Sequence, residues 1–314
     1  MPPTILRGSL AVLLAAALFG ISGAVARLVF RDAALPPMVL VALRMTLSFA
    51  GLLPALALAN RNLLRVPRGQ WLPLLLWGAG PMLLVQYTYF LAIAETNVAT
   101  AIFLEYLAPV LSALYGWAFR QERPGPALLA GIVLSVGGAG LLVLGGEQGM
   151  TLSPLGLAYG IGAAFAMAWY SVWGGRFEGR VGPWAQLVWG MGGAALAAQF
   201  VTPPWVLAPY LADRSLWPFY AFLAVLASSV PFGLYIYGVR ALPATVAMII
   251  ATAEPVVAAV VAWFLLGEGL RWLQLVGAGA IVAAVITVQV SAARRNQEHP
   301  GRAEAGPVEA RPAR

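Results

Sequence analysis

The segment Ala101–Glu122, with the sequence AIFLEYLAPVLSALYGWAFRQE, is matched 146 positions later by Ala247–Glu268, with the sequence AMIIATAEPVVAAVVAWFLLGE. The same displacement superposes landmarks along the rest of the chain: Phe19 and Phe165, Tyr89 and Tyr235, Pro109 and Pro255, Trp117 and Trp263, Gly131 and Gly277. Residues 8–145 and 154–291 are therefore predicted to be two copies of one unit. Repeats of this length in an apolar chain are typical of proteins that move solutes across membranes.

The composition excludes an ordinary soluble domain. Hydrophobic residues make up 61% of the chain and charged residues 10%, against about 45–50% and about 25% in a typical soluble domain. The net charge of +7 comes from arginine alone, and the arginines lie between apolar runs, which argues against a nucleic-acid partner. Cysteine is absent, so disulfides and thiolate metal sites are excluded, and no metal or other cofactor is expected.

The apolar runs are each near the roughly 20 residues that a helix needs to cross the hydrocarbon core. They predict ten spans, at about 9–30, 37–59, 71–94, 97–119, 126–145, 154–175, 183–202, 216–239, 244–266 and 271–291. The expected fold class is an all-α integral membrane protein with five helices in each half. Thr202–Ser215 is expected to be the longest loop, and the polar residues 292–314 are expected to form a disordered cytoplasmic tail.

The first span allows a second interpretation. Arg7, the apolar run after it and Ala24-Val25-Ala26 are also arranged like a signal peptide with a small-residue cleavage site. The matching span at 154–175 favours a membrane helix, because removal of the first span would leave the two halves unequal.

The distribution of arginine predicts the orientation. With a cytoplasmic N-terminus, the inner loops and ends carry Arg7, Arg61, Arg65, Arg68, Arg120, Arg123, Arg176, Arg180, Arg240, Arg294 and Arg295, and the outer loops carry Arg31, Arg214 and Arg271. By the positive-inside rule, both termini are expected in the cytoplasm. Because each half has an odd number of spans, the second copy enters the membrane from the opposite side. The repeats are therefore predicted to be inverted, which allows alternating access to a site near the midplane.

The repeated motif resembles a known family. The run Ala101–Pro109, with Trp117 and Glu122 after it, is similar to the end of a first EamA-type repeat of the drug/metabolite transporter superfamily. The run Ala253–Ala259, with Leu265–Glu268 after it, is similar to the end of the second. The resemblance implies an inner-membrane carrier, commonly an exporter of amino acids or other small metabolites, with a cavity between the halves. Related branches carry nucleotide sugars, other sugars or lipophilic cations.

Two glutamates, Glu105 and Glu254, lie near the middle of the fourth and ninth predicted spans. A charge at this depth is costly unless it faces protein or water. Either the glutamates line a wet cavity, where one binds a proton or the ammonium group of a substrate, or they are paired or protonated groups without a role in transport. Pro109 and Pro255 lie beside them and leave the carbonyls of Glu105 and Ala251 without a donor from the helix.

Arg44, in the second span, is the best basic counterpart. It either binds a substrate carboxylate or has a structural role, in which it snorkels outward or neutralises a buried glutamate. Three further residues inside the spans either contact substrate or pack between helices: Gln86, Tyr106 and Trp169. Pro81 and Pro231, at similar depths of the third and eighth spans, are hinges for rocking or static kinks.

These features predict a secondary transporter that exports amino acids or related amphipathic metabolites across the inner membrane by alternating access. Proton coupling through Glu105 first and Glu254 second is a hypothesis that rests on the buried carboxylates. The expected partners are a small-molecule substrate and the lipid bilayer, without nucleic acid and without an obligatory protein partner. Lipophilic cations or drugs, sugars and nucleotide derivatives are alternative substrates. An intramembrane transferase built on the two glutamates is an alternative of a different class, although no HExxH motif or phosphate-binding loop supports an enzyme.

Overall fold

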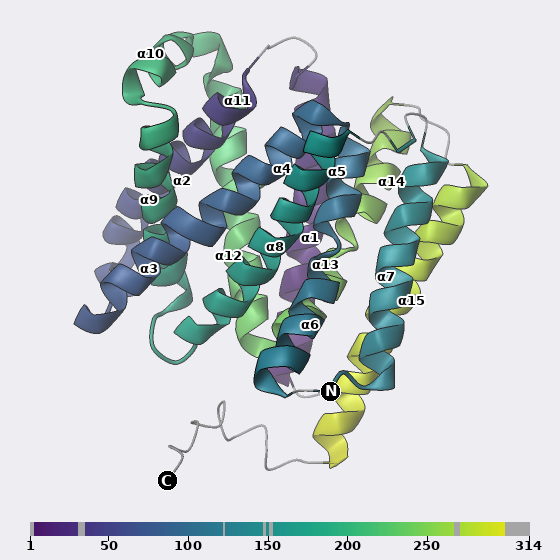
Figure 1. Ribbon diagram of the computed structural model, residues 1–314. Helices are drawn as coiled ribbons and strands as arrows, with labels where there is room; N and C mark the ends of the chain where they lie inside the picture. The colour runs from purple at the N-terminus through teal and green to yellow at the C-terminus, as the bar shows by residue number, and fades with distance from the viewer. Residues whose placement is uncertain are drawn as a thin grey trace.

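The structure is a computed structural model that describes residues 3–30, 35–121, 123–146, 149–150, 153–266 and 271–298. The described chain folds as helices joined by short connections (Figure 1). In the first half these are α1 (Pro3–Phe30), α2 (Pro37–Asn60), α3 (Trp71–Trp77), η3 (Gly78–Met82), α4 (Leu83–Glu95), α5 (Val98–Glu105), α6 (Ala108–Arg120) and α7 (Pro126–Gly145). In the second half they are α8 (Pro154–Gly174), α9 (Pro183–Val201), α10 (Pro204–Ala212), α11 (Trp217–Ala224), η6 (Val225–Ser229), α12 (Val230–Ala241), α13 (Ala244–Ala251), α14 (Glu254–Leu266) and α15 (Trp272–Glu298).

Nine helical stretches of the described chain are long and apolar enough to cross a membrane. The remaining span of the predicted ten is α9, whose 19 residues are long enough for the hydrocarbon core. Its hydropathy is lowered by Gln186 and Gln199, which are satisfied inside the protein by hydrogen bonds to Gly174 and Thr46. Since α9 packs against α2 and α3, these polar groups do not face lipid. The chain is an all-α, multi-pass membrane protein.

The two halves are duplicated and inverted. α1 begins and α15 ends at one end of the bundle, which we call the terminal side, whereas α8 begins at the opposite end, the far side (Figure 1). α7 and α15 pack along each other. Gly138 of α7 lies against the backbone of Gly277, and Gly131 lies against Ala284 and Val288 of α15. The displacement of 146 carries Gly131 onto Gly277 and Gly138 onto Ala284. The contact between Gly131 and Ala284 is therefore the symmetric equivalent of the contact between Gly277 and Gly138.

Four of the ten spans are interrupted, in symmetric pairs. The third and eighth spans contain one π-helical turn each, η3 and η6. The fourth and ninth spans are each broken into two helices, α5 with α6 and α13 with α14. π-Turns and breaks of this kind occur often at functional sites. In a membrane they require partners for the backbone groups that leave the helix.

Two expectations about the connections are corrected. The segment Thr202–Ser215 is not an open loop, because Pro204 begins the helix α10, a position where proline suits the first helical turn. The last helix does not end at residue 291, because α15 continues to Glu298. Alanine, arginine, glutamine and glutamate in this extension all favour helix. The rest of the expected tail lies outside the described residues.

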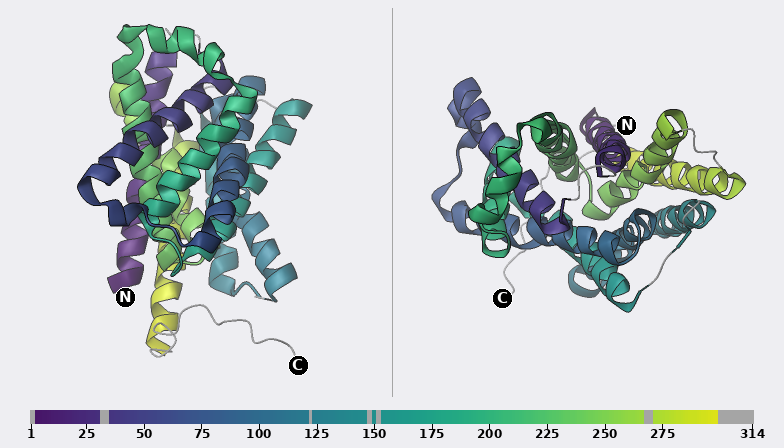
Figure 2. Two further views of the ribbon diagram at one scale, coloured as in Figure 1. Left: turned by 90° about the vertical axis from the view of Figure 1, so that its left-hand side faces the viewer. Right: turned by 90° about the horizontal axis from the view of Figure 1, so that it is seen from above.

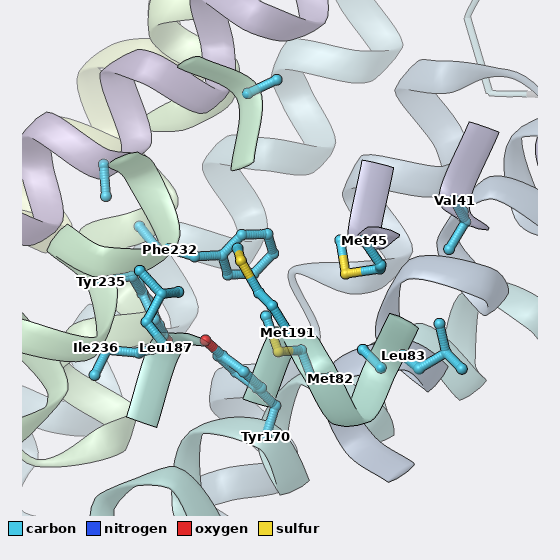
Figure 3. Packing of buried hydrophobic residues seen from close by; sticks show 14 of the residues in the cluster. Val41, Met45, Met82, Leu83, Tyr170, Leu187, Met191, Phe232, Tyr235 and Ile236 are labelled. Carbon is cyan, nitrogen blue, oxygen red and sulfur yellow. The ribbon is translucent and has the colours of Figure 1, made fainter. Parts of the chain in front are cut away.

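The core is centred on Trp77 of α3, which stacks on Tyr170 of α8 with the ring centroids 4.7 Å apart. Its indole N–H also donates to the Tyr170 carbonyl at 3.0 Å. Figure 3 shows three methionines from three spans, Met45, Met82 and Met191, which belong to the same buried cluster as Trp77 and Tyr170. This packing joins spans from both halves and holds the elements that carry the site.

Candidate functional site

Two symmetric helix breaks form the centre of the candidate site. α5 ends at Glu105 and α13 ends at Ala251, positions that are equivalent under the displacement of 146. Each break precedes a proline, Pro109 or Pro255, which is the second residue of the following helix. Proline has no N–H to donate to the carbonyl four residues earlier, so a continuous helix would leave that carbonyl unbonded. The break places backbone polar groups and side chains of both halves at the same depth.

Tyr106 connects one break to the other. Its hydroxyl oxygen lies 2.8 Å from Oε2 of Glu254 and 3.2 Å from the carbonyl oxygen of Ala251. The Ala251 carbonyl is the one that Pro255 leaves without a helical donor. A phenol has one hydrogen, so it can satisfy both acceptors only if Glu254 is protonated and donates to the phenol oxygen. The local geometry therefore depends on the charge of Glu254.

The two glutamates occupy opposite ends of their helices. Glu105 is the last residue of α5, and Glu254 is the first residue of α14. Both side chains are partly exposed although they lie midway along their spans. The positive end of the helix dipole favours a carboxylate at Glu254, and the negative end disfavours one at Glu105. The symmetric breaks thus give the carboxylates unequal surroundings.

Arg44 binds the π-turn η6 and not a carboxylate. Its Nε donates to the hydroxyl of Ser228 at 2.6 Å, its Nη1 donates to Oε1 of Gln86 at 3.0 Å, and its Nη2 donates to the carbonyl of Ala227. That carbonyl lies four residues before Pro231, which cannot donate to it. Arg44 and Gln86 are 9% and 8% exposed. These contacts favour a structural cation that joins α2 and α4 to η6.

Three charged groups, two from the first half and one from the second, lie near one another. Arg44, Glu105 and Glu254 lie close enough for their charges to interact. Tyr89 lies within electrostatic range of Arg44, and Tyr235 lies within range of Glu105. The repeat relates Tyr89 to Tyr235, because the two tyrosines occupy equivalent positions in the two halves.

Trp169 is not part of this group. It lies on an exposed apolar stripe of α8 with Ile161 and Phe165, which are 47% and 58% exposed, and is itself 39% exposed. Its ring stacks on Trp173 at 5.6 Å. Five of the six predicted binding residues therefore lie near one another, and the sixth lies on this stripe, where the edge of its ring is close to Gly80 of η3. Of the two prolines outside the breaks, Pro81 lies within η3 and Pro231 follows η6.

The two sides of the breaks differ in how closely the helices meet. On the terminal side, α6 packs against α13, and the hydroxyls of Ser112 and Thr245 are 2.9 Å apart. On the far side, α5 and α14 make no comparable contact within the described chain. Figure 1 shows α6 and α13 near the end where both termini lie, and α5 and α14 near the other. Within the described chain, the helices on the two sides of the breaks therefore pair closely on the terminal side and not comparably on the far side.

Comparison with protein families matches both halves separately. Residues 6–144 and residues 154–289 each match the EamA-like transporter family. The first match includes the span that was also arranged like a signal peptide, so that span belongs to the repeat.

Three relatives show the same family across most of the chain. The inner membrane transporter YicL of Salmonella typhimurium is 30% identical over 92% of this chain and 97% of its own. The threonine/homoserine exporter RhtA of Escherichia coli K12 is 30% identical over 70% of this chain and 72% of its own. The transporter YwfM of Bacillus subtilis is 26% identical over 92% and 95%.

A solved crystal structure shares the fold. It superposes with a TM-score of 0.69 at 23% identity and covers 93% of this chain and 98% of the other. The two family matches and the relatives agree on a transporter and not an enzyme. The chain therefore belongs to the EamA-like transporter family of the drug/metabolite transporter superfamily, with one EamA domain in each half.

Proposed function

We propose that this protein is a secondary transporter that exports amino acids, or related small amphipathic metabolites, across the inner membrane by alternating access. The observation that carries the proposal is that Glu105 and Glu254 lie at two symmetric helix breaks, with Arg44, held at η6, within electrostatic range of both. An amino acid carries an ammonium and a carboxylate group, and a site with both signs of charge complements both. The similarity to a threonine/homoserine exporter supports this substrate class.

The two carboxylates are the groups that meet the ammonium. Glu105 and Glu254 are partly exposed, whereas the guanidinium of Arg44 is engaged by protein acceptors. Arg44 therefore acts mainly by its charge and by holding η6, and the Tyr106 hydroxyl and the helix breaks supply polar groups for the substrate carboxylate. Tyrosine rings around the carboxylates would also accept a lipophilic cation. Such a cation is the second candidate substrate.

The orientation that we propose places the terminal side in the cytoplasm. Arg7, Arg176, Arg180 and Arg240 and the arginine-bearing connection Arg61–Arg68 all lie at that side, whereas Arg214 and Arg271 lie at the far side. This bias follows the positive-inside rule. The described conformation then has its cytoplasmic side closed by α6 and α13, and substrate leaves toward the far side.

Proton coupling is part of the proposal. Glu105 is the first candidate for the proton that is bound and released in each cycle, because the C-terminal end of α5 disfavours its charged form. Glu254 is the second candidate, through its contact with Tyr106. A proton taken up from outside during export would then enter in exchange for substrate.

The test is uptake of radiolabelled threonine, homoserine and a panel of other amino acids into proteoliposomes, with and without an imposed pH gradient. We expect saturable flux for one group of amino acids, and loss of gradient dependence in Glu105→Gln. Glu95→Gln is the matched control, because Glu95 is exposed at the end of α4. Gradient-dependent flux that persists in both Glu105→Gln and Glu254→Gln contradicts the proton mechanism. Flux of a lipophilic cation without amino-acid flux would favour the second candidate.

A further inference from the structure

The contact between α6 and α13 is a gate with a polar centre. Ser112 and Thr245, 4% and 9% exposed, form its hydrogen bond. Around them Ala108 and Met248 are buried in one small apolar cluster, against which Leu111 packs. A buried hydroxyl pair inside an apolar contact stabilises that contact specifically, because separation of the helices breaks the bond.

The repeat relates this gate to its counterpart on the far side. The displacement of 146 carries α6 onto α14 and α13 onto α5. It carries Ser112 onto Ala258, and it carries Ala99 onto Thr245. The counterpart contact would therefore join two alanines, both of which are partly exposed in this structure.

The main contacts of these four helices with α1 and α8 obey the symmetry. α6 packs on α8 as α14 packs on α1, and α13 packs on α1 as α5 packs on α8. The most extensive contact without a comparable counterpart is the one between α6 and α13, since α5 and α14 are not comparably packed in the described chain. α13 also packs on α7 and α8, whereas α5 has no comparable contact with α15 or α1 among the described residues. The two halves thus differ at the gate and share only part of its surroundings.

We propose that the Ser112–Thr245 hydrogen bond is a latch that biases the transporter toward the conformation closed on the terminal side. In the opposite conformation, α5 packs against α14 with Ala99 next to Ala258, and that gate has no equivalent bond. The two gates are therefore unequal in strength although the helices that form them are symmetric. This inference deepens the proposed alternating access by naming the groups that set its resting equilibrium.

The chain has no cysteine, so introduced thiols can report each gate directly. The pair Ala99→Cys with Ala258→Cys should form a disulfide only when α5 meets α14. In a second protein, the pair Ser112→Cys with Thr245→Cys should form a disulfide readily in the resting state, since the two hydroxyls are 2.9 Å apart. Both pairs are measured in proteoliposomes with an added oxidant and without substrate.

The decisive experiment removes the Ser112–Thr245 hydrogen bond from the protein that carries the Ala99→Cys and Ala258→Cys pair. Ser112→Ala with Thr245→Val replaces both partners by apolar groups and leaves no unpaired hydroxyl. We expect the Ala99→Cys and Ala258→Cys pair to cross-link roughly three- to ten-fold faster in this background, the population shift that one buried hydrogen bond is worth. The matched control is Ser135→Ala with Thr287→Val, because these hydroxyls bond only within their own helices.

Equal rates of far-side cross-linking in the protein without the Ser112–Thr245 bond and in the control protein would show that this bond does not bias the conformation. A far-side pair that never cross-links, in protein whose Ser112→Cys and Thr245→Cys pair does, would overturn the symmetric gate. Neither readout needs a transported substrate. Absence of amino-acid flux would therefore count against the proposed function, whereas these cross-linking results decide the latch.

Discussion

The hydroxyl of Tyr106 is the single group that joins the two helix breaks. It bonds Glu254 of the other half and reaches the Ala251 carbonyl that Pro255 leaves free. Its position between an ionisable acceptor and a backbone acceptor makes it sensitive to the charge of Glu254. A change of protonation at Glu254 is thereby passed to the backbone of the break.

Tyr106→Phe should lower stability and alter the response of transport to pH. The substitution leaves the Ala251 carbonyl without its donor, which costs about 1–3 kcal/mol for a buried acceptor. Thermal unfolding in detergent measures the first effect, and flux against pH measures the second. Tyr237→Phe is the control, because Tyr237 is 44% exposed on α12. If both variants unfold at the wild-type temperature, the hydrogen bond from Tyr106 to the break does not contribute to the stability of the protein.

Arg44 is a buried cation held by two side-chain acceptors and one backbone carbonyl. The guanidinium fork spans a hydroxyl, an amide oxygen and a carbonyl from three different places on two spans. Lysine keeps the charge but has no planar fork that can reach three such acceptors at once.

Arg44→Lys should therefore destabilise the protein by about 1–3 kcal/mol, although the charge is retained. The measurement is again thermal unfolding, with Arg61→Lys as the control at an exposed position. If Arg44→Lys is as stable as the control and instead raises only the KM for substrate, Arg44 binds substrate directly. That outcome would favour binding of a substrate carboxylate by Arg44 over the structural role that its contacts with η6 support.

At the scale of the elements, α7 and α15 pack too closely for side chains at their crossing. A Cβ on Gly138 would lie 2.7 Å from the carbonyl oxygen of Gly277, and a Cβ on the adjacent Gly137 would meet nothing within 4 Å. The two neighbouring glycines on one helix thus differ in what they can accommodate.

Gly138→Ala should separate α7 from α15 and cost about 1–3 kcal/mol, as overpacking usually does. Gly137→Ala should be neutral or stabilising by roughly 0.5–1 kcal/mol, because alanine favours helix. Unfolding temperatures of the two variants, measured side by side, test both statements. Equal effects of the two substitutions would show that the crossing can relax.

The break between α13 and α14 is an element that proline keeps open. Pro255→Ala restores an N–H that can donate to the Ala251 carbonyl in place of Tyr106. We expect a more stable protein with slower transport, because α13 and α14 would then move as one helix. Pro126→Ala, at the first residue of α7, is the control, since no helical donor is needed there. A rise in both stability and flux would contradict a role for the break in movement.

At the scale of the whole molecule, the inverted halves define two sides that should be chemically distinguishable. Ser215, on the far side, and Gly69, on the terminal side, are both exposed. With Ser215→Cys and Gly69→Cys, a membrane-impermeant maleimide applied to spheroplasts should label the first and spare the second. Labelling of Gly69→Cys alone would reverse the proposed orientation. In the left view of Figure 2, as in Figure 1, α1 begins and α15 ends on the same side of the bundle, and labelling assigns that side to the cytoplasm or to the outside.

The sequence by itself determined the all-α membrane fold, the duplicated halves and the depth of Glu105 and Glu254. Hydropathy and the displacement of 146 are properties of the linear chain, and they require no knowledge of packing. Trp169 shows the limit of this reasoning, because a mid-span position does not say which way a side chain faces.

Only the tertiary structure decided that Tyr106 reaches Glu254, that Arg44 binds η6, and that α6 packs on α13 while the described parts of α5 and α14 make no comparable contact. The first two depend on how spans distant in the sequence pack against one another. The third cannot be read from the repeat at all, because a symmetric pair of halves is compatible with closure on either side. The side that is closed depends on a difference between the halves, and the structure places the Ser112–Thr245 bond at that difference.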